Sequence, residues 1–408
     1  MTTSTEPSAV AGATRFPIYT EEFAADPQAS YREMRRRYGS LVPVELAPEV
    51  PATLVIGYHD AVRILNDPDH FPADPRMWEQ TIPADCPVKP MMQWYPNVLR
   101  NAGAAHWRYR QANVSAVDGV DLHGLHAIVE REAIPLINTF CASGEAELIT
   151  QYAFPLVFAG LNDMLGCPPA IGQRVAQGMA ALFDSVDEKA EQGMAMLSGA
   201  LLELIELKRR EPGDDMVTRL LQHDAGLDDT EMLANIISLY GAGLEPQQNL
   251  IINTLRLILT DDRFAGDVLG GSLSTRDALD EVLFNDPPMA NFPTSYPRQP
   301  MLIGDTWLPA HQPVIISLAG CNNDPAISGG ERIGNRSHLA WSLGPHGCPA
   351  KSVATLVAQE AIDQLLDALP ELRLAIPVDE LSWRPGPFHR ALTALPVVFP
   401  ACPPLNVK

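Results

Sequence analysis

HLAWSLGPHGCPAKS, residues 338–352, is the stretch of this sequence that decides the fold. Two glycines and a proline lie just before Cys348, a second proline follows it, and a helical pattern begins at about residue 350. A loop of this composition lets the backbone approach a flat ligand closely. A thiol at the start of a helix experiences the positive end of the helix dipole, which favours the thiolate. Cys348 is therefore a candidate metal ligand, although a lone cysteine is more often a small buried hydrophobic residue.

The composition indicates a large folded protein with no affinity for polyanions. The chain has 408 residues, 46% of them apolar, so it can bury a large core. With 29 basic and 50 acidic residues, its formal net charge of −21 repels phosphate backbones and anionic lipid surfaces. We therefore expect no nucleic-acid partner and no membrane association.

The cysteines and the N-terminus indicate a reducing compartment. The six cysteines form no C-x-x-C pair, which argues against a zinc ribbon, a thioredoxin-like motif and a disulfide framework. Residues 1–15 lack the basic start and apolar stretch of a signal peptide, and no run approaches the roughly 20 apolar residues that a membrane-spanning helix needs. We expect a cytoplasmic protein with reduced thiols and no membrane insertion.

The hydrophobic periodicity predicts a mainly α protein with small β-sheets (α+β), folded as a single large domain. We expect a flexible N-terminal arm over residues 1–18 and one domain over residues 19–408. Within this domain, the pattern predicts strands at about 40–60, a helical core over about 104–285 and a ligand loop at 338–350.

A proline-rich segment, residues 68–100, interrupts the regular pattern. A loop of this length is uncommon in a compact domain unless it covers a functional site. We therefore interpret this segment as a lid.

His106 and Arg110 form a second candidate group, in the sequence HWRYR. Their spacing of four residues places both side chains on one face of an expected helix, where they can bind the same anion. The alternative is that they form an ordinary solvated pair on a helix surface.

The segment around Cys348 resembles the haem-ligand loop of cytochromes P450, which has the pattern F-G-x-G-x-H-x-C-x-G. Three of its marked positions are identical, and a tryptophan takes the place of the phenylalanine. The residues at the marked positions are Trp341, Ser342, Gly344, His346, Cys348 and Ala350.

This resemblance, which extends over most of the chain, implies the cytochrome P450 fold and one haem b (iron protoporphyrin IX). It implies that Cys348 binds the iron and that His106 and Arg110, which match the family's H-x-x-x-R, bind the haem propionates. The family has a further arginine before a strand pair and a histidine before the ligand loop. These positions imply the same role for Arg298 and His338.

AGLEPQQN, residues 242–249, departs from the family's A/G-G-x-D/E-T-T. Ala242 and Gly243 match the small residues beside which oxygen binds, and Glu245 matches the acid of the proton route. Pro246 replaces the first threonine and cannot donate an N–H to the carbonyl of Ala242. We expect a kinked helix whose freed carbonyl binds a water; a kink that serves only packing is compatible with the same sequence.

DEVLFNDPP, residues 280–288, is the second departure. The family has an E-x-x-R helix here, and Phe284 replaces its arginine. An unpaired buried carboxylate is costly, so we expect Glu281 to be buried and to pair with Arg332, Arg336 or backbone amides.

The two departures together resemble an actinobacterial subset of cytochromes P450 associated with G-protein-like signalling operons. Three functions follow from the resemblance. The first is a monooxygenase that receives electrons from a ferredoxin-type partner and oxidises a small, apolar organic molecule. The second is a haem enzyme that uses peroxide or catalyses coupling. The third is a haem-binding signalling or assembly protein with little turnover, which binds a protein partner from such an operon.

Overall fold

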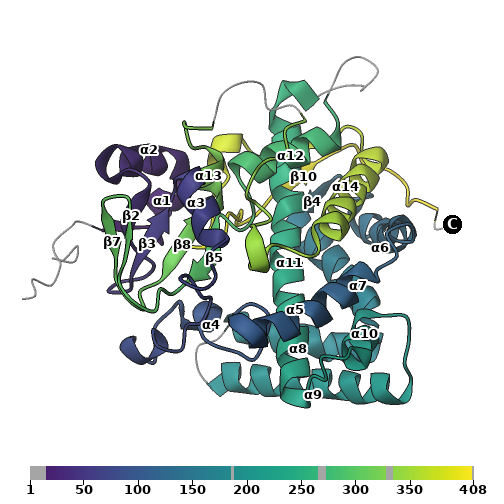
Figure 1. Ribbon diagram of the computed structural model, residues 1–408. Coiled ribbons are helices and arrows are strands. Elements are labelled where there is room, and N and C mark those ends of the chain that lie inside the picture. The colour runs from purple at the N-terminus through teal and green to yellow at the C-terminus, as the bar shows by residue number, and fades with distance from the viewer. Residues whose placement is uncertain (1–14, 185–187, 265–272, 328–333, 407–408) are drawn as a thin grey trace, which may run out of the picture.

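The computed structural model describes residues 15–184, 188–264, 273–327 and 334–406 (Figure 1). Within these residues the protein is mainly helical, with sheets of five, three and two strands. This confirms the mainly α class with small β-sheets that the periodicity predicts. No helix of the described part is both long and apolar enough to cross a membrane.

The largest sheet lies on one side of the molecule and joins distant parts of the chain (Figure 1). It pairs the predicted N-terminal strands with a strand from the last third of the sequence, because β3 is parallel to β8. The strands, in their order across the sheet, are β1 (Phe16–Pro17), β2 (Leu41–Glu45), β3 (Pro51–Val55), β8 (Val314–Ser317) and β5 (Asn291–Ser295).

The N-terminal arm is shorter than expected. Residues 1–14 lie outside the described residues, but Phe16 and Pro17 pair with β2, and Ile18 is fully buried. Residues 16–18 therefore belong to the domain, because the sheet offers Ile18 an apolar environment that a free arm lacks.

The helix α11 (Asp229–Thr260) runs through the middle of the molecule (Figure 1). It begins with a capping box, in which Asp228 and Glu231 satisfy each other's backbone N–H groups. It packs against α7 (Phe154–Leu165), α12 (Thr275–Asn285) and α14 (Lys351–Ala368). Its length matches the predicted helix over 229–260.

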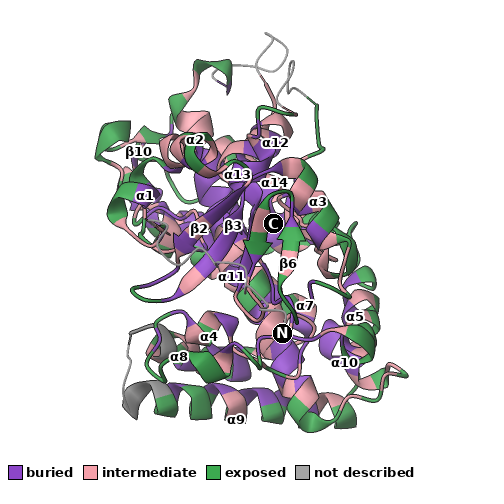
Figure 2. Cartoon of the chain, turned by 60° about the vertical axis from the view of Figure 1, so that its left-hand side comes forward, coloured by how far each residue is buried: buried purple, intermediate pink, exposed green. Residues whose placement is uncertain are grey.

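The remaining elements surround this centre, and Figure 2 shows that their buried residues face inward. The other α-helices are α1 (Glu21–Ala25), α2 (Pro27–Tyr38), α3 (Tyr58–Leu65), α4 (Lys89–Met92), α5 (Gly103–Asp118), α6 (Leu125–Phe140), α8 (Pro169–Asp184), α9 (Glu188–Arg210), α10 (Met216–Gln222) and α13 (Leu318–Asn322). The smaller sheets consist of β4 (Glu145–Glu147), β10 (Pro396–Val398) and β9 (Arg373–Leu374), and of β6 (Met301–Ile303) and β7 (Thr306–Leu308).

The segment 68–100 is packed into the fold along much of its length. Trp78 and Met92 belong to the hydrophobic cluster behind the five-stranded sheet, and Asn97 and Arg100 are also buried. Burial of a side chain of this size contributes roughly 1.5–3 kcal/mol relative to exposure. The segment therefore forms a wall of the domain, and its role as a lid stays a prediction.

Candidate functional site

The loop before α14 holds Cys348 in a defined place. The backbone N–H of Cys348 donates to the carbonyl of Trp341 over 2.8 Å, and a short 3₁₀ turn (Gly344–His346) lies between the two residues. Ala350 is the N-cap residue of α14. Cys348 thus lies two residues before the cap, at the helix start that the sequence predicts.

Two residues of this loop have backbone conformations that favour glycine. Ser342 has φ +58° and Gly344 has φ +67°. A Cβ atom at Gly344 would lie 2.1 Å from the carbonyl oxygen of Leu65, at the end of α3. The loop therefore contacts the backbone of α3 so closely that residue 344 must be glycine, whereas Ser342 tolerates the conformation at a cost of about 1–2 kcal/mol.

The electrostatic environment of Cys348 has two opposing parts. Burial raises the pKa of the thiol above its usual value, while the amide of Ala350 and the charges of Arg110 and Lys351 act to lower it. The helix start thus favours the thiolate, as the sequence predicts. Burial has the larger effect on the pKa of the thiol and favours the protonated form. A cation bound to the sulfur would supply the missing stabilisation of the thiolate.

Helix α5 presents His106 and Arg110 to the Cys348 loop. The rings of His106 and His346 lie 4.0 Å apart between centroids, inclined by 35°. Burial lowers the pKa of His106 to about 4, and the nearby charge of Arg110 acts in the same direction. Burial, with the neighbouring basic groups, lowers the pKa of His346 to about 3. At neutral pH both imidazoles are therefore uncharged and can each donate one hydrogen bond.

This cluster is arranged to receive an anion. His106 is 5% exposed, yet its Nε2 atom has no hydrogen-bond partner within the described residues. Burial also lowers the pKa of the Arg110 guanidinium, and Arg110 forms no ion pair in the described part of the chain. Buried basic groups without a carboxylate are costly. The donor set therefore fits the carboxylates of a porphyrin, with Cys348 close by to bind its iron.

Arg298 and His338, both expected in this cluster, lie elsewhere. Arg298 is exposed, and its charge acts on Asp74, whose pKa is lowered mainly by its hydrogen bond with Arg76. His338 packs against α12, where its ring meets that of Phe284 edge-on at 5.2 Å. The structure therefore does not bring these two residues into the cluster, and their binding of the propionates stays a prediction.

Sequence reasoning missed two other residues at the cluster. Arg100 is buried, and its charge contributes to the low pKa of His346. Tyr296 is buried beside Arg100, and its hydroxyl has no partner within the described residues. Neither lies in a recognisable motif, so only the fold reveals them.

The middle of α11 presents Ala242, which is exposed although the helix is central. The helix continues without a break through Pro246, so the expected kink does not interrupt it. Glu245 is held by Arg384 from the C-terminal loop, and its Oε2 lies 3.7 Å from Nε2 of His389. The acid expected in a proton route is thus engaged in an ion pair.

Glu281 does not have the expected environment. Its side chain is 27% exposed and pairs with Arg263 over 2.8 Å, while Arg332 lies outside the described residues. The buried carboxylate is instead Asp280, 5% exposed, which accepts a hydrogen bond from Arg336 over 2.8 Å. The prediction of a buried Glu281 paired with Arg332 or Arg336 is therefore wrong by one residue: the helix turns Asp280 inward and Glu281 outward.

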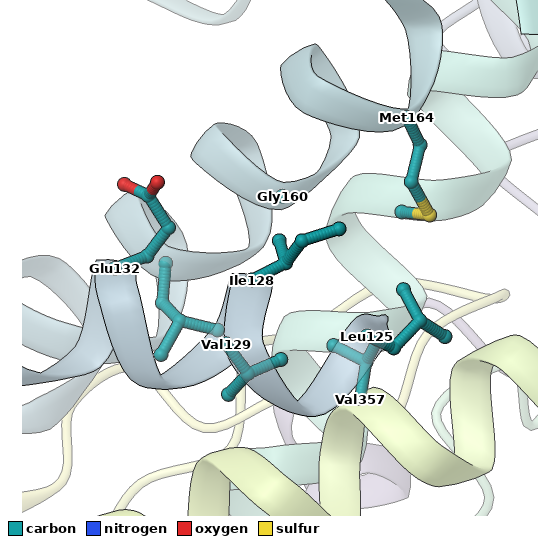
Figure 3. Close-up of a pocket in the computed structure, with 8 residues that line it drawn as sticks. Leu125, Ile128, Val129, Glu132, Gly160, Met164 and Val357 are labelled. Atoms are coloured by element: carbon teal, nitrogen blue, oxygen red, sulfur yellow. The ribbon is translucent and has the colours of Figure 1, made fainter. Parts of the chain in front are cut away.

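An apolar pocket between α6, α7 and α14 is separate from this cluster (Figure 3). Leu125, Val129, Met164 and Val357 contribute to its lining, and Glu132 is the one charged residue there. Because this lining offers a single carboxylate and no group of convergent donors, we place the functional site at Cys348.

Comparisons with known proteins show which proteins this chain is similar to. No family model matches the chain. The sequence is 29% identical over 399 residues to cytochrome P450 107B1 of Saccharopolyspora erythraea, covering 93% of this chain and 96% of that protein. It is 29% identical over 395 residues to the cytochrome P450 monooxygenase PikC of Streptomyces venezuelae, covering 92% of each. CYP154C4 from Streptomyces sp. ATCC 11861 has a similar structure, with a TM-score of 0.84 and 25% identity over 96% of this chain and 99% of that chain. The expected cytochrome P450 fold is therefore confirmed.

The close contact of Gly344 leads to a first prediction. Gly344→Ala should lower the free energy of unfolding by about 2–4 kcal/mol, because the methyl group meets the Leu65 carbonyl and the backbone is left-handed. Gly347→Ala is the control, because its Cβ would lie 3.3 Å from its nearest neighbour at a negative φ. Urea unfolding of both variants measures the difference. Equal stabilities would contradict the geometry.

The environment of Asp280 leads to a second prediction. Asp280→Ala should lower the free energy of unfolding by about 1–3 kcal/mol, because it leaves the buried Nε atom of Arg276 without its charge partner. Glu281→Ala, at a more exposed position, should cost less than about 1 kcal/mol. Thermal and urea unfolding of the two variants test this order, and the reverse order would restore the original expectation for Glu281.

Proposed function

We propose that the chain, which is similar to cytochromes P450 over most of its length, is a member of that superfamily and acts as a haem-thiolate monooxygenase, which oxidises a small, apolar organic molecule with electrons from a ferredoxin-type partner. The observation that carries the proposal is the position of Cys348 two residues after His346, whose ring contacts the buried His106, in a group of buried and half-buried basic residues that pair with no carboxylate among the described residues. Relatives named as hydroxylases, among them 6-deoxyerythronolide B hydroxylase of Saccharopolyspora erythraea, support the reaction class.

Different residues of the site would bind different parts of the cofactor. Cys348 would bind the iron, while His106, Arg110 and His346 would hold the propionates by charge-assisted and neutral hydrogen bonds. When bound, thiolate-ligated haem supplies the activation of oxygen. The close contact of Gly344 with Leu65 keeps the ligand loop in place.

Proton delivery would depend on Glu245, because Pro246 has neither a hydroxyl nor an N–H. Arg384 forms an ion pair with the carboxylate of Glu245, so this residue is held toward the C-terminal loop. His389 is buried, and burial lowers its pKa, so at neutral pH its ring is uncharged and can exchange a proton with Oε2 of Glu245 through a small movement. The C-terminal loop thus supplies polar groups near the position of the missing threonine.

A second candidate function is a haem protein with little turnover, which would act by binding a partner protein. Two observations favour it. Pro246 has no hydroxyl at the position where the family pattern has a threonine, and Glu245 of the same helix is engaged in an ion pair with Arg384. The two functions differ in whether the native protein forms product.

Replacement of Cys348 tests the cofactor. We expect the purified protein to contain one haem b and its reduced CO complex to show the red-shifted absorption band of thiolate ligation. Cys348→Ala should abolish this band, whereas Cys321→Ala, at a fully buried cysteine outside the cluster, should retain it. Absorption spectra of the reduced CO complexes measure both. An unchanged band in the Cys348 variant would end the proposal.

Replacement of Glu245 and Pro246 tests the proton route. If the native protein is an oxygenase, Glu245→Ala should lower product formation by about 10²–10⁴, the contribution of a positioned proton donor. Pro246→Thr should raise the product formed per electron or leave it unchanged. Product and hydrogen peroxide are measured with reductant, oxygen and a ligand identified by its spectral shift. If only Pro246→Thr forms product, the second candidate function is the better account.

A further inference from the structure

We propose that Arg100 and Tyr296 bind a carboxylate of the haem, in the role that the sequence pattern assigns to Arg298. The inference rests on the proposed function, because it concerns the same cofactor. It adds two residues that come from the end of the 68–100 segment and from the turn after β5.

Arg100 is a buried cation that lacks an acidic partner. Only 6% of it is exposed, and within the described residues no carboxylate forms an ion pair with it. Its Nη2 donates to the carbonyl of Met91, and its guanidinium lies 5.2 Å from the centre of the Phe292 ring. A guanidinium has five N–H donors, so these contacts leave most of them for another acceptor.

Tyr296 is a second donor without an acceptor. The residue is 2% exposed, and its hydroxyl has no hydrogen-bond partner in the described part of the chain. The ring of Trp78 lies 5.8 Å away and packs the phenol in place. Because burial raises the pKa of Tyr296, the hydroxyl stays protonated and can donate to an anion.

These two donors lie close to the group already described. Arg100 lies three residues before Gly103, the first residue of α5, and α5 carries His106, whose ring lies 4.0 Å from that of His346. The charge of Arg100 also acts on Tyr296. The Nε2 atom of His106 is also buried without a partner within the described residues. Arg100 and His106 therefore lie on the same stretch of chain, and the ring of His106 contacts that of His346, which precedes Cys348 by two residues in the sequence. A carboxylate there would satisfy several buried groups at once.

Arg298 has none of these properties. It is exposed, and its charge acts on Asp74, which already pairs with Arg76. An exposed arginine has water to satisfy its donors, whereas Arg100 does not. Arg100→Ala is therefore the test variant, and Arg298→Ala is its control.

The experiment compares haem release by the wild type and by three variants of the holoprotein. Haem transfer to excess apomyoglobin is followed by absorbance. Arg100→Ala should release haem about 10- to 100-fold faster, as expected for a lost charge-assisted hydrogen bond, and Tyr296→Phe about 3- to 10-fold faster. Arg298→Ala should match the wild type.

A second measurement separates carboxylate binding from a structural role. Wild type and Arg100→Ala are each reconstituted with haem and with haem dimethyl ester, in which both carboxylates are esterified. If Arg100 binds a carboxylate, the difference between the two proteins should largely vanish with the ester. Tyr296→Phe removes one oxygen only, so it provides the same comparison should Arg100→Ala fold poorly.

The outcomes are distinct. Faster release from Arg100→Ala that disappears with the ester supports the inference. An equal penalty with haem and with the ester, or a loss of haem from Arg298→Ala alone, overturns it and leaves the proposed function intact. A wild type that binds no haem with a thiolate signature overturns the proposed function, and this inference with it.

Discussion

The structure depends on a group of buried and half-buried basic side chains around His346 that pair with no carboxylate among the described residues. His106 and Arg100 are buried and Arg110 is half-buried, in a chain whose acidic residues outnumber its basic ones by 50 to 29. Such an arrangement costs free energy by itself. It is understandable when an anionic ligand is part of the folded state, because ligand binding then contributes to stability.

The core beside α12 shows how the fold compensates for a changed ion pair. In the family, a glutamate and an arginine lie one turn apart; here Phe284 takes the arginine's place and packs edge-on against His338. The carboxylate that remains buried is one residue earlier, at Asp280, and Arg336 reaches it from the segment before the ligand loop. In this chain, the Phe284–His338 contact and the Asp280–Arg336 ion pair occupy the region where the family pattern has a glutamate–arginine pair. This explains why residue 281 is free to pair with Arg263 near the surface.

Local signals in the sequence predicted much of the fold and the centre of the site. The apolar periodicity predicted α11 to its ends, and the glycine and proline residues around Cys348 predicted the loop before α14. The loop motif also identified His346, which the fold places against His106. These features depend on neighbours in the sequence, so sequence patterns contain them.

The residues that the sequence did not predict are defined by contacts between distant segments. Arg100 and Tyr296 are almost 200 positions apart, and neither belongs to a periodic or conserved-looking pattern. The position of Arg298 in the family pattern predicts that it binds a propionate. Spacing in the sequence does not determine which side of a turn a side chain occupies. Exposure and partner atoms decide that, and both require coordinates.

Glu245, on α11, forms an ion pair with Arg384 of the C-terminal loop. Pro246 leaves this helix without a hydroxyl and without one backbone donor, so the acid has fewer local partners. Arg384 and His389 approach it from a loop that is fixed at its base by the pairing of Trp383 with Leu392. The position of this loop therefore determines which polar groups surround the carboxylate of Glu245, whereas Pro246, its neighbour in the helix, offers it no donor.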